Sequence, residues 1–178
     1  MSTEQKNLQE IIKFRLEKLD KIKGAGINPY GYNFDKVNHI ADIILNGKEG
    51  IGSSVKTAGR MVSFRKMGKA SFTHLQDNDS KIQVYLKNDL LPENIYDSIV
   101  RNLDLGDIIG VSGELFITKT GELSIKADDL AILSKNIRPL PNLKEKDGEA
   151  FNAFEDKELR YRHRQLDLIA NPEIKSIF

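Results

Sequence analysis

The first part of the chain carries hydrophobic residues at helical spacing. Their positions fall on one face of a helix before two glycines end the pattern, at Leu8, Ile11, Ile12, Leu16 and Leu19. Such spacing predicts an amphipathic helix. A shorter helix is predicted from His39 to Leu45. Residues 1–54 are therefore predicted to form an N-terminal helical extension.

From Val55 onward the period changes from helical to two, which predicts β-strands. Five segments show it: Val55–Phe64, Ser71–Asp77, Lys81–Leu86, Asp107–Thr118 and Glu122–Leu133. A helix is predicted between the third and fourth strands, from Pro92 to Leu103, because its apolar residues share one face. This order is typical of the OB fold, a five-stranded Greek-key barrel that commonly binds oligonucleotides. The predicted fold class is α+β, mainly β, with the barrel over residues 55–134.

The segment after the barrel has a different composition. Residues 135–157 contain two spaced prolines, Pro139 and Pro141, which resist regular structure and predict a linker. A helical pattern resumes near Glu155 and continues into residues 158–178. The chain ends at Phe178 without a capping or packing signal, so it is expected to be a fragment of a longer protein.

Alternation along the strands also predicts which side chains face outward. The core-facing positions are Ile82, Val84 and Leu86 in the third strand and Leu123, Ile125 and Ala127 in the fifth. Gln83 and Tyr85, and Glu122 with Ser124, then face outward. The second strand allows two interpretations: either Phe72 and His74 face outward with Leu75 buried, or Phe72 is buried and the small polar residues face out.

The net charge of +1 excludes a polycation that binds through bulk charge alone. Its distribution is uneven, because residues 56–87 hold seven basic and two acidic residues, whereas residues 88–178 hold 12 basic and 17 acidic ones. A local basic patch suits a partner that carries phosphates. A strand edge protected by lysines would give the same pattern.

Outward-facing residues on this basic barrel suggest a base-binding site. An exposed Phe72 ring can stack on a base, while the amide of Gln83 and the carboxylate of Glu122 can read a Watson–Crick edge. Arg65 can supply a planar cation beside them. Strict alternation along the first strand puts Arg65 and Arg60 on opposite faces. A bulge or bend near Gly59 is therefore needed to bring Arg65 to the outer face together with Arg60.

Composition limits the other classes of function. The absence of cysteine excludes a disulfide framework and a thiolate zinc site, and no apolar run is long enough to span a bilayer. The N-terminus lacks the pattern of a secretory signal, so a cytoplasmic location without a membrane role is expected. No catalytic, cofactor-binding or metal-binding residue is predicted in this chain.

Several segments resemble bacterial class II lysyl-tRNA synthetases. The likeness is carried by AGRMVSFRKMGKASFTHLQD at 58–77, KIQVYL at 81–86, DLGDIIGVSGELFITKTGELSI at 104–125, LSKNIRPLP at 133–141 and ELRYRHRQLDLIANPEIKSIF at 158–178. The resemblance implies that the barrel binds the anticodon loop of tRNA(Lys) and holds its central uridine. It implies that the contacts come from Phe72, Gln83, Arg65 and Glu122, with Arg60 and Lys69 as candidates for phosphate contact.

The same resemblance implies that a full-length protein would aminoacylate tRNA(Lys) with ATP and Mg²⁺, as a homodimer. Residues 158–178 would be the truncated start of its class II catalytic domain, although Gln165 stands where the family usually has tyrosine. No cofactor and no catalysis are expected from this chain alone. Three alternatives stay open: the related barrels of aspartyl- or asparaginyl-tRNA synthetases, against which the MGKASF segment argues; a free-standing barrel that coats single strands; and a barrel that binds proteins or oligosaccharides.

Overall fold

The computed structural model describes residues 3–78, 80–140, 143–146, 149–152, 157–170 and 177. The chain divides into two compact units, Met1–Arg138 and Pro139–Phe178. The described residues of the first unit form three α-helices and five strands: α1 Thr3–Gly24, α2 Ile40–Asn46, β1 Ser54–Met67, β2 Ala70–Asp77, β3 Ser80–Lys87, α3 Ile95–Ser98, β4 Ile108–Ile117 and β5 Leu123–Ser134. The predicted helical extension and the predicted barrel thus belong to one unit.

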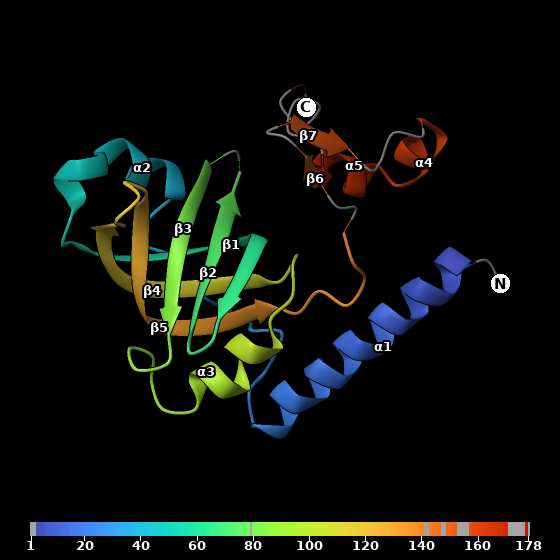
Figure 1. Ribbon diagram of the computed structural model, residues 1–178, viewed down its shortest axis with the longest axis horizontal. Helices are drawn as coiled ribbons and strands as arrows, with labels where there is room; N and C mark the ends of the chain where they lie inside the picture. The colour runs from blue at the N-terminus through green and yellow to red at the C-terminus, as the bar shows by residue number, and fades with distance from the viewer. Residues whose placement is uncertain are drawn as a thin grey trace. The chain divides into compact units, whose positions relative to one another are not determined.

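The five strands form a closed barrel in the order β1-β2-β3-β5-β4, with β4 pairing back onto β1. All neighbours are antiparallel except β3 and β5, which pair in parallel through residues 83–85 and 124–126. This is the predicted OB fold, with α3 between β3 and β4. Figure 1 shows α2 and α3 at opposite ends of the strands, so each covers one end of the barrel.

The core fills the inside of the barrel, as the alternation predicts. Ile82, Val84 and Leu86 of β3 are buried, and so are Ile125 and Ala127 of β5. Closure also requires a close approach of two backbones: a Cβ on Gly113 of β4 would lie 2.2 Å from the carbonyl oxygen of Lys126. Only glycine fits there, beside a register shift between β4 and β5.

The helix predicted from Pro92 to Leu103 is shorter than expected. Regular α-helix covers only Ile95–Ser98, and a 3₁₀ turn follows at Val100–Asn102. The predicted apolar face is nevertheless buried, because Tyr96, Ile99, Val100 and Leu103 pack against the barrel end. Tertiary packing therefore fixes this segment even though its backbone leaves the α-helical conformation.

Helix α1 forms as predicted, but its predicted apolar face is not buried throughout. Leu19 and Ile22 near its C-terminal end are buried, whereas Ile11 and Leu16 are exposed. Two basic residues of the helix, Arg15 and Lys18, are largely buried. Arg15 donates a hydrogen bond to the Asn136 carbonyl oxygen. Hydrophobic spacing alone does not anticipate this, because these two residues are buried through polar partners at the start of β4 and the end of β5.

Those partners form an ionic cluster, defined here as Lys18, Asp104, Asp107 and Lys135. Lys135 Nζ lies 2.6 Å from Asp104 Oδ2 and 2.9 Å from Asp107 Oδ2, and Lys18 pairs with Asp104. The side chains of Lys135 and Asp107 are fully buried. Burial acts to raise the pKa of Asp104, but hydrogen bonds from Lys135 and Lys18 outweigh it and hold that pKa below its usual range. The cluster joins α1 to the barrel.

The second unit contains a two-stranded hairpin of β6 Leu143–Lys146 and β7 Glu149–Asn152, followed by α4 Lys157–Arg162 and α5 Arg164–Ala170. The prediction of a linker without regular structure over 135–157 misses this hairpin. Glu155, where a helix was expected to resume, lies outside the described residues. In the helical part Asp167 is buried and accepts hydrogen bonds from Arg160 and Arg164. The role of residues 158–178 as the start of a catalytic domain stays a prediction.

Candidate nucleic-acid interface

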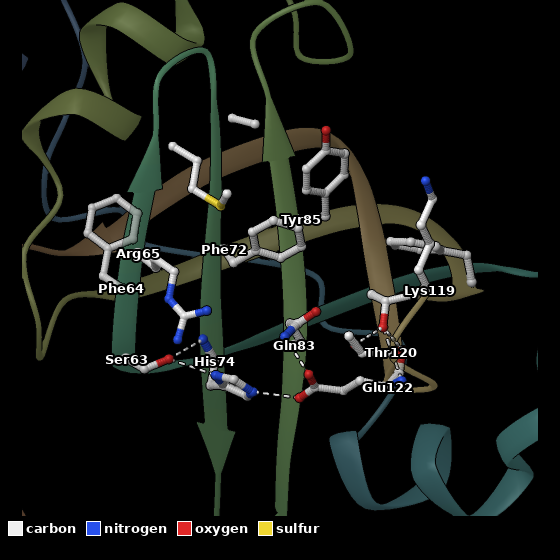
Figure 2. Close-up of a pocket in the computed structure, with 14 residues that line it drawn as sticks. Ser63, Phe64, Arg65, Phe72, His74, Gln83, Tyr85, Lys119, Thr120 and Glu122 are labelled. Carbon is white, nitrogen blue, oxygen red and sulfur yellow. Dashed lines mark hydrogen bonds and ion pairs between the residues drawn. The ribbon is translucent and has the colours of Figure 1, made fainter. Parts of the chain in front are cut away.

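A hollow of about 770 Å³ opens on the outer face of the barrel. It lies over β1, β2 and β3, and the loop between β4 and β5 borders it (Figure 2). The four residues predicted to bind a base all line this hollow: Phe72, Gln83, Arg65 and Glu122. The structure thus brings together side chains from three strands and one loop that are up to 57 positions apart in the chain.

The orientation of β2 resolves the two interpretations of its sequence. Ser71, Thr73 and Leu75 are fully buried, so Phe72 and His74 face outward. The two hydroxyls are buried without an unsatisfied group: Ser71 Oγ lies 3.0 Å from the Tyr96 hydroxyl, and Thr73 donates to the Ser63 carbonyl oxygen at 2.7 Å. The outward orientation of Phe72 is therefore confirmed.

Aromatic rings from three strands line one side of the hollow. The ring centroids of Phe72 and Tyr85 lie 4.9 Å apart with planes inclined by 35°, and those of Tyr85 and Phe116 lie 6.3 Å apart in an edge-on arrangement. Tyr85 thus supports the Phe72 ring from the side, as Figure 2 shows. Such packing limits the motion of Phe72 while the ring still lines the open hollow.

Arg65 reaches the hollow through a bulge in β1. The register of β1 against β2 shifts between Met61 and Ser63, so that Ser63 pairs with His74 and Arg65 pairs with Phe72. The extra residue lies at position 62, whereas the sequence suggested a bend near Gly59. Within the part of the chain that the structure describes, no hydrogen bond or ion pair engages the Arg65 guanidinium. Its donors are available to a ligand.

Glu122 lies at the centre of a polar network in the hollow. Its Oε2 accepts a hydrogen bond from Gln83 Nε2 at 2.6 Å, and its Oε1 lies 2.8 Å from His74 Nε2. Gln83 Oε1 in turn accepts the hydroxyl of Ser124 at 2.9 Å. Ser124 was predicted to face outward, yet it is fully buried beneath this network. On the other side, His74 Nδ1 lies 2.7 Å from Ser63 Oγ.

Some residues of the hollow had not been assigned a role from the sequence. Alternation placed His74 and Tyr85 on the outer face, but nothing in the pattern linked His74 to Glu122, 48 residues away. Ser63 depends on the bulge, which period-two alternation does not reveal. Lys119 lies in the β4–β5 loop at the rim, where strand periodicity carries no information.

The two residues considered for phosphate contact do not line the hollow. Arg60 donates a hydrogen bond to the Gly106 carbonyl oxygen at 2.9 Å, and Lys69 lies in the exposed turn between β1 and β2. Lys119, by contrast, borders the same hollow as the predicted base-binding residues. A phosphate role for Arg60 and Lys69 stays a prediction.

The described residues contain neither a metal-binding cluster nor a helix that could span a membrane. No group of three or more His, Asp or Glu side chains there could hold a metal ion. No helix in the described ranges is both long and apolar enough to cross a membrane.

Comparison with known proteins identifies the barrel and relates the whole chain to one group of enzymes. Residues 55–133 match a family model described as an OB-fold nucleic acid binding domain. The chain is 42% identical over 170 residues to the lysine–tRNA ligase of Fusobacterium nucleatum subsp. nucleatum, covering 96% of this chain and 33% of that protein. It is 41% identical over 175 residues to the enzyme of Carboxydothermus hydrogenoformans, covering 98% of this chain and 34% of that protein.

A third similar protein is the lysine–tRNA ligase of Pelotomaculum thermopropionicum, 43% identical over 178 residues, with 99% of this chain and 33% of that protein covered. The chain therefore spans about a third of the length of the curated relatives that it matches.

Proposed function

Because the chain belongs to the lysine–tRNA ligase family and matches the N-terminal portion of its members, we propose that its barrel binds the anticodon loop of tRNA(Lys) and reads the central uridine. One observation carries this proposal. A half-buried aromatic ring, a guanidinium and an amide–carboxylate pair converge in one open hollow, from Phe72, Arg65, Gln83 and Glu122. Together they offer a stacking surface, a positive charge and an edge-reading group for a single nucleotide.

The base stacks on Phe72 in this proposal. Stacking of a base on an aromatic side chain contributes about 1–3 kcal/mol and tolerates any base, because every base has a π-face. The Tyr85 ring packs against the Phe72 ring and keeps it in place. Stacking therefore supplies affinity, and selectivity has to come from the polar groups beside it.

Glu122 and Gln83 supply that selectivity. An ionised carboxylate is an acceptor only, and each Glu122 oxygen keeps lone-pair capacity after its bond to His74 or Gln83. Uracil offers an N3–H donor to such an acceptor, whereas cytosine presents a lone pair at N3. The second N–H of the Gln83 amide and the Arg65 guanidinium can donate to the uracil carbonyls. The arrangement therefore favours uridine over cytidine.

The activity of the whole protein is a further part of the proposal. A full-length protein of this family would join lysine to tRNA(Lys) with ATP and Mg²⁺ in the cytoplasm, as a homodimer. This chain spans about a third of the length of its relatives, and in this proposal ATP and Mg²⁺ are held by the remaining part of the protein. This chain would contribute recognition of the tRNA.

The test is binding of two RNA hairpins that differ at one position. One carries the lysine anticodon UUU, and the other has cytidine at the central position. The wild-type chain is expected to prefer the first. Phe72→Ala should weaken that binding roughly 5- to 150-fold, the range that corresponds to one lost stacking contact. Gln83→Ala should weaken it and reduce the preference. Affinities are measured by fluorescence anisotropy at one fixed salt concentration.

Tyr32→Ala serves as the control, because it removes a fully exposed aromatic ring outside the hollow. Melting temperatures of all three variants should stay close to wild type. Equal affinity of the wild type for both hairpins and for unrelated single strands would contradict the proposal and indicate a non-specific coating protein. A large loss of stability in Phe72→Ala would show that the ring serves the core instead of the ligand.

A further inference from the structure

Five polar side chains form one continuous series of hydrogen bonds across the floor of the hollow. The series runs from β1 to β5 in the order Ser63, His74, Glu122, Gln83 and Ser124. Figure 2 shows its central part, in which the His74 ring lies between Ser63 and Glu122. His74 is about one-third exposed and Glu122 a little under one-half, so both lie within reach of a ligand and of water.

The directions of these hydrogen bonds are fixed by chemistry. Glu122 as a carboxylate only accepts, so His74 Nε2 carries a proton and donates to Oε1. Ser63 Oγ accepts the backbone N–H of His74 at 3.1 Å, and its own proton is then free to point to Nδ1. This arrangement gives each ring nitrogen of His74 one hydrogen-bond partner. His74 is thereby held from one side by β1 and holds Glu122 on the other.

Gln83 is oriented by the same series. Its Nε2 donates to Glu122 and its Oε1 accepts from Ser124. A flip of the amide would place Oε1 against the Glu122 carboxylate, so that two acceptors face each other at a distance that now holds a 2.6 Å hydrogen bond. The flip is unfavourable only as long as Glu122 stays in place. Without His74, Glu122 has one tether fewer and its half-exposed side chain gains rotamer freedom.

We propose that His74 is a positioning residue that sets the preference of the hollow for uridine over cytidine by holding Glu122 and, through it, the amide of Gln83. The inference rests on the proposed function, since it concerns the base that the hollow reads. A free Glu122 can turn away from the cytosine N3, and a free Gln83 can present its oxygen to the cytosine amino group. Loss of His74 therefore relaxes selectivity more than it lowers affinity for uridine.

The experiment compares the 178-residue chain and its variants on the UUU hairpin and on the hairpin with central cytidine. His74→Ala is expected to reduce the ratio of the two affinities by about tenfold, the equivalent of one hydrogen bond to a charged group, while the affinity for UUU falls less than about threefold. His74→Gln is expected to restore most of the ratio, because its Nε2 can donate to Glu122 as the ring does. Melting temperatures report that each variant is folded.

Three results would overturn the inference: a wild-type ratio in His74→Ala, an equal loss of affinity for both hairpins, or no restoration by His74→Gln. An equal loss would mean that the histidine touches the nucleotide directly. Failure of the proposed function gives a different result, namely no preference in the wild type itself, and the inference falls with it.

A measurement without RNA tests whether His74 positions Gln83, independently of whether the hollow binds the hairpins. In the free wild-type protein the side-chain amide protons of Gln83 should give two well-separated NMR signals, because one of them is held by Glu122. In His74→Ala the separation between the two signals should decrease and the signals should broaden. In His74→Gln the wild-type separation should return. Unchanged signals in His74→Ala would show that His74 does not control Gln83.

Discussion

The barrel carries two networks of charged and polar side chains, and they differ in how much hydrogen-bonding capacity their groups have left. In the ionic cluster, the fully buried Asp107 accepts hydrogen bonds from Lys135 and from the backbone N–H groups of Asp104 and Asn136. In the hollow, Glu122 is bonded on both oxygens but half-exposed, so its remaining lone pairs face solvent. The first network is closed and the second is open.

The difference shows why charge alone does not identify a binding site. Both networks contain a carboxylate that accepts hydrogen bonds on each of its two oxygens. A buried network whose groups are all satisfied offers nothing to a ligand and serves to fix α1 against the barrel. An open network whose groups keep hydrogen-bonding capacity, beside the Arg65 guanidinium, can exchange water for a nucleotide. Unused hydrogen-bonding capacity at an accessible position is the property that separates the two.

The largest expected effect comes from breaking the closed network. Lys135→Met removes its central cation and leaves the buried Asp107 and the partly buried Asp104 without their shared partner, which should cost about 3–5 kcal/mol of unfolding free energy. Urea titration followed by circular dichroism measures it. Binding of the UUU hairpin by the folded fraction should be unchanged. The matched control is Lys126→Met, which removes an exposed ion pair with Glu114 and should cost at most about 1 kcal/mol.

A smaller effect is expected from Asp104→Asn, and it should depend on pH. A carboxyl whose pKa is lower in the folded than in the unfolded chain stabilises the fold above its unfolded value of about 3.9, and that contribution is lost as pH falls through the folded value. The variant should be about 1–3 kcal/mol less stable than wild type at pH 7. The gap should narrow below about pH 4. Burial raises the pKa of Asp107. Asp107 is present in both the wild type and the variant, so its titration does not cause the difference between them.

Urea titrations at several pH values give that gap. A difference that stays constant from pH 7 to pH 3 would contradict the assignment of Asp104 as an ionised partner of Lys18 and Lys135. Glu122→Gln extends the comparison to the open network: a half-exposed carboxylate should change the unfolding free energy by no more than about 0.5 kcal/mol.

The smallest effect is expected at the rim of the open network. Lys119 lines the hollow without a partner among the described residues, so we expect it to contact a phosphate of the bound loop. Lys119→Ala should lower affinity only a few-fold, and the slope of log affinity against log salt concentration should fall by about 0.7. Both hairpins should be affected alike. An unchanged slope would place Lys119 outside the contact surface. Lys69→Ala tests in the same way whether the turn between β1 and β2 contacts a phosphate.

Local sequence patterns determined the barrel and much of the site. Period-two alternation predicted all five strands and the buried face of β3, because neighbouring side chains of a strand must point to opposite sides. The same rule placed Gln83 outward, and aromatic and polar chemistry then nominated Phe72, Arg65 and Glu122. These predictions needed only short-range geometry and the chemistry of the side chains.

The tertiary structure decided what depends on distant partners. Ser71 and Thr73 are buried, and Phe72 faces outward, because the two hydroxyls form hydrogen bonds with the Tyr96 hydroxyl and the Ser63 carbonyl oxygen. The bulge at position 62 brings Arg65 to the outer face, and no alternation rule reveals an inserted residue. Arg15 and Lys18 are buried because they form hydrogen bonds with the Asn136 carbonyl oxygen and the Asp104 carboxylate. In each case the free energy of burial depends on a hydrogen bond to a group that is far away along the chain, which only the folded structure supplies.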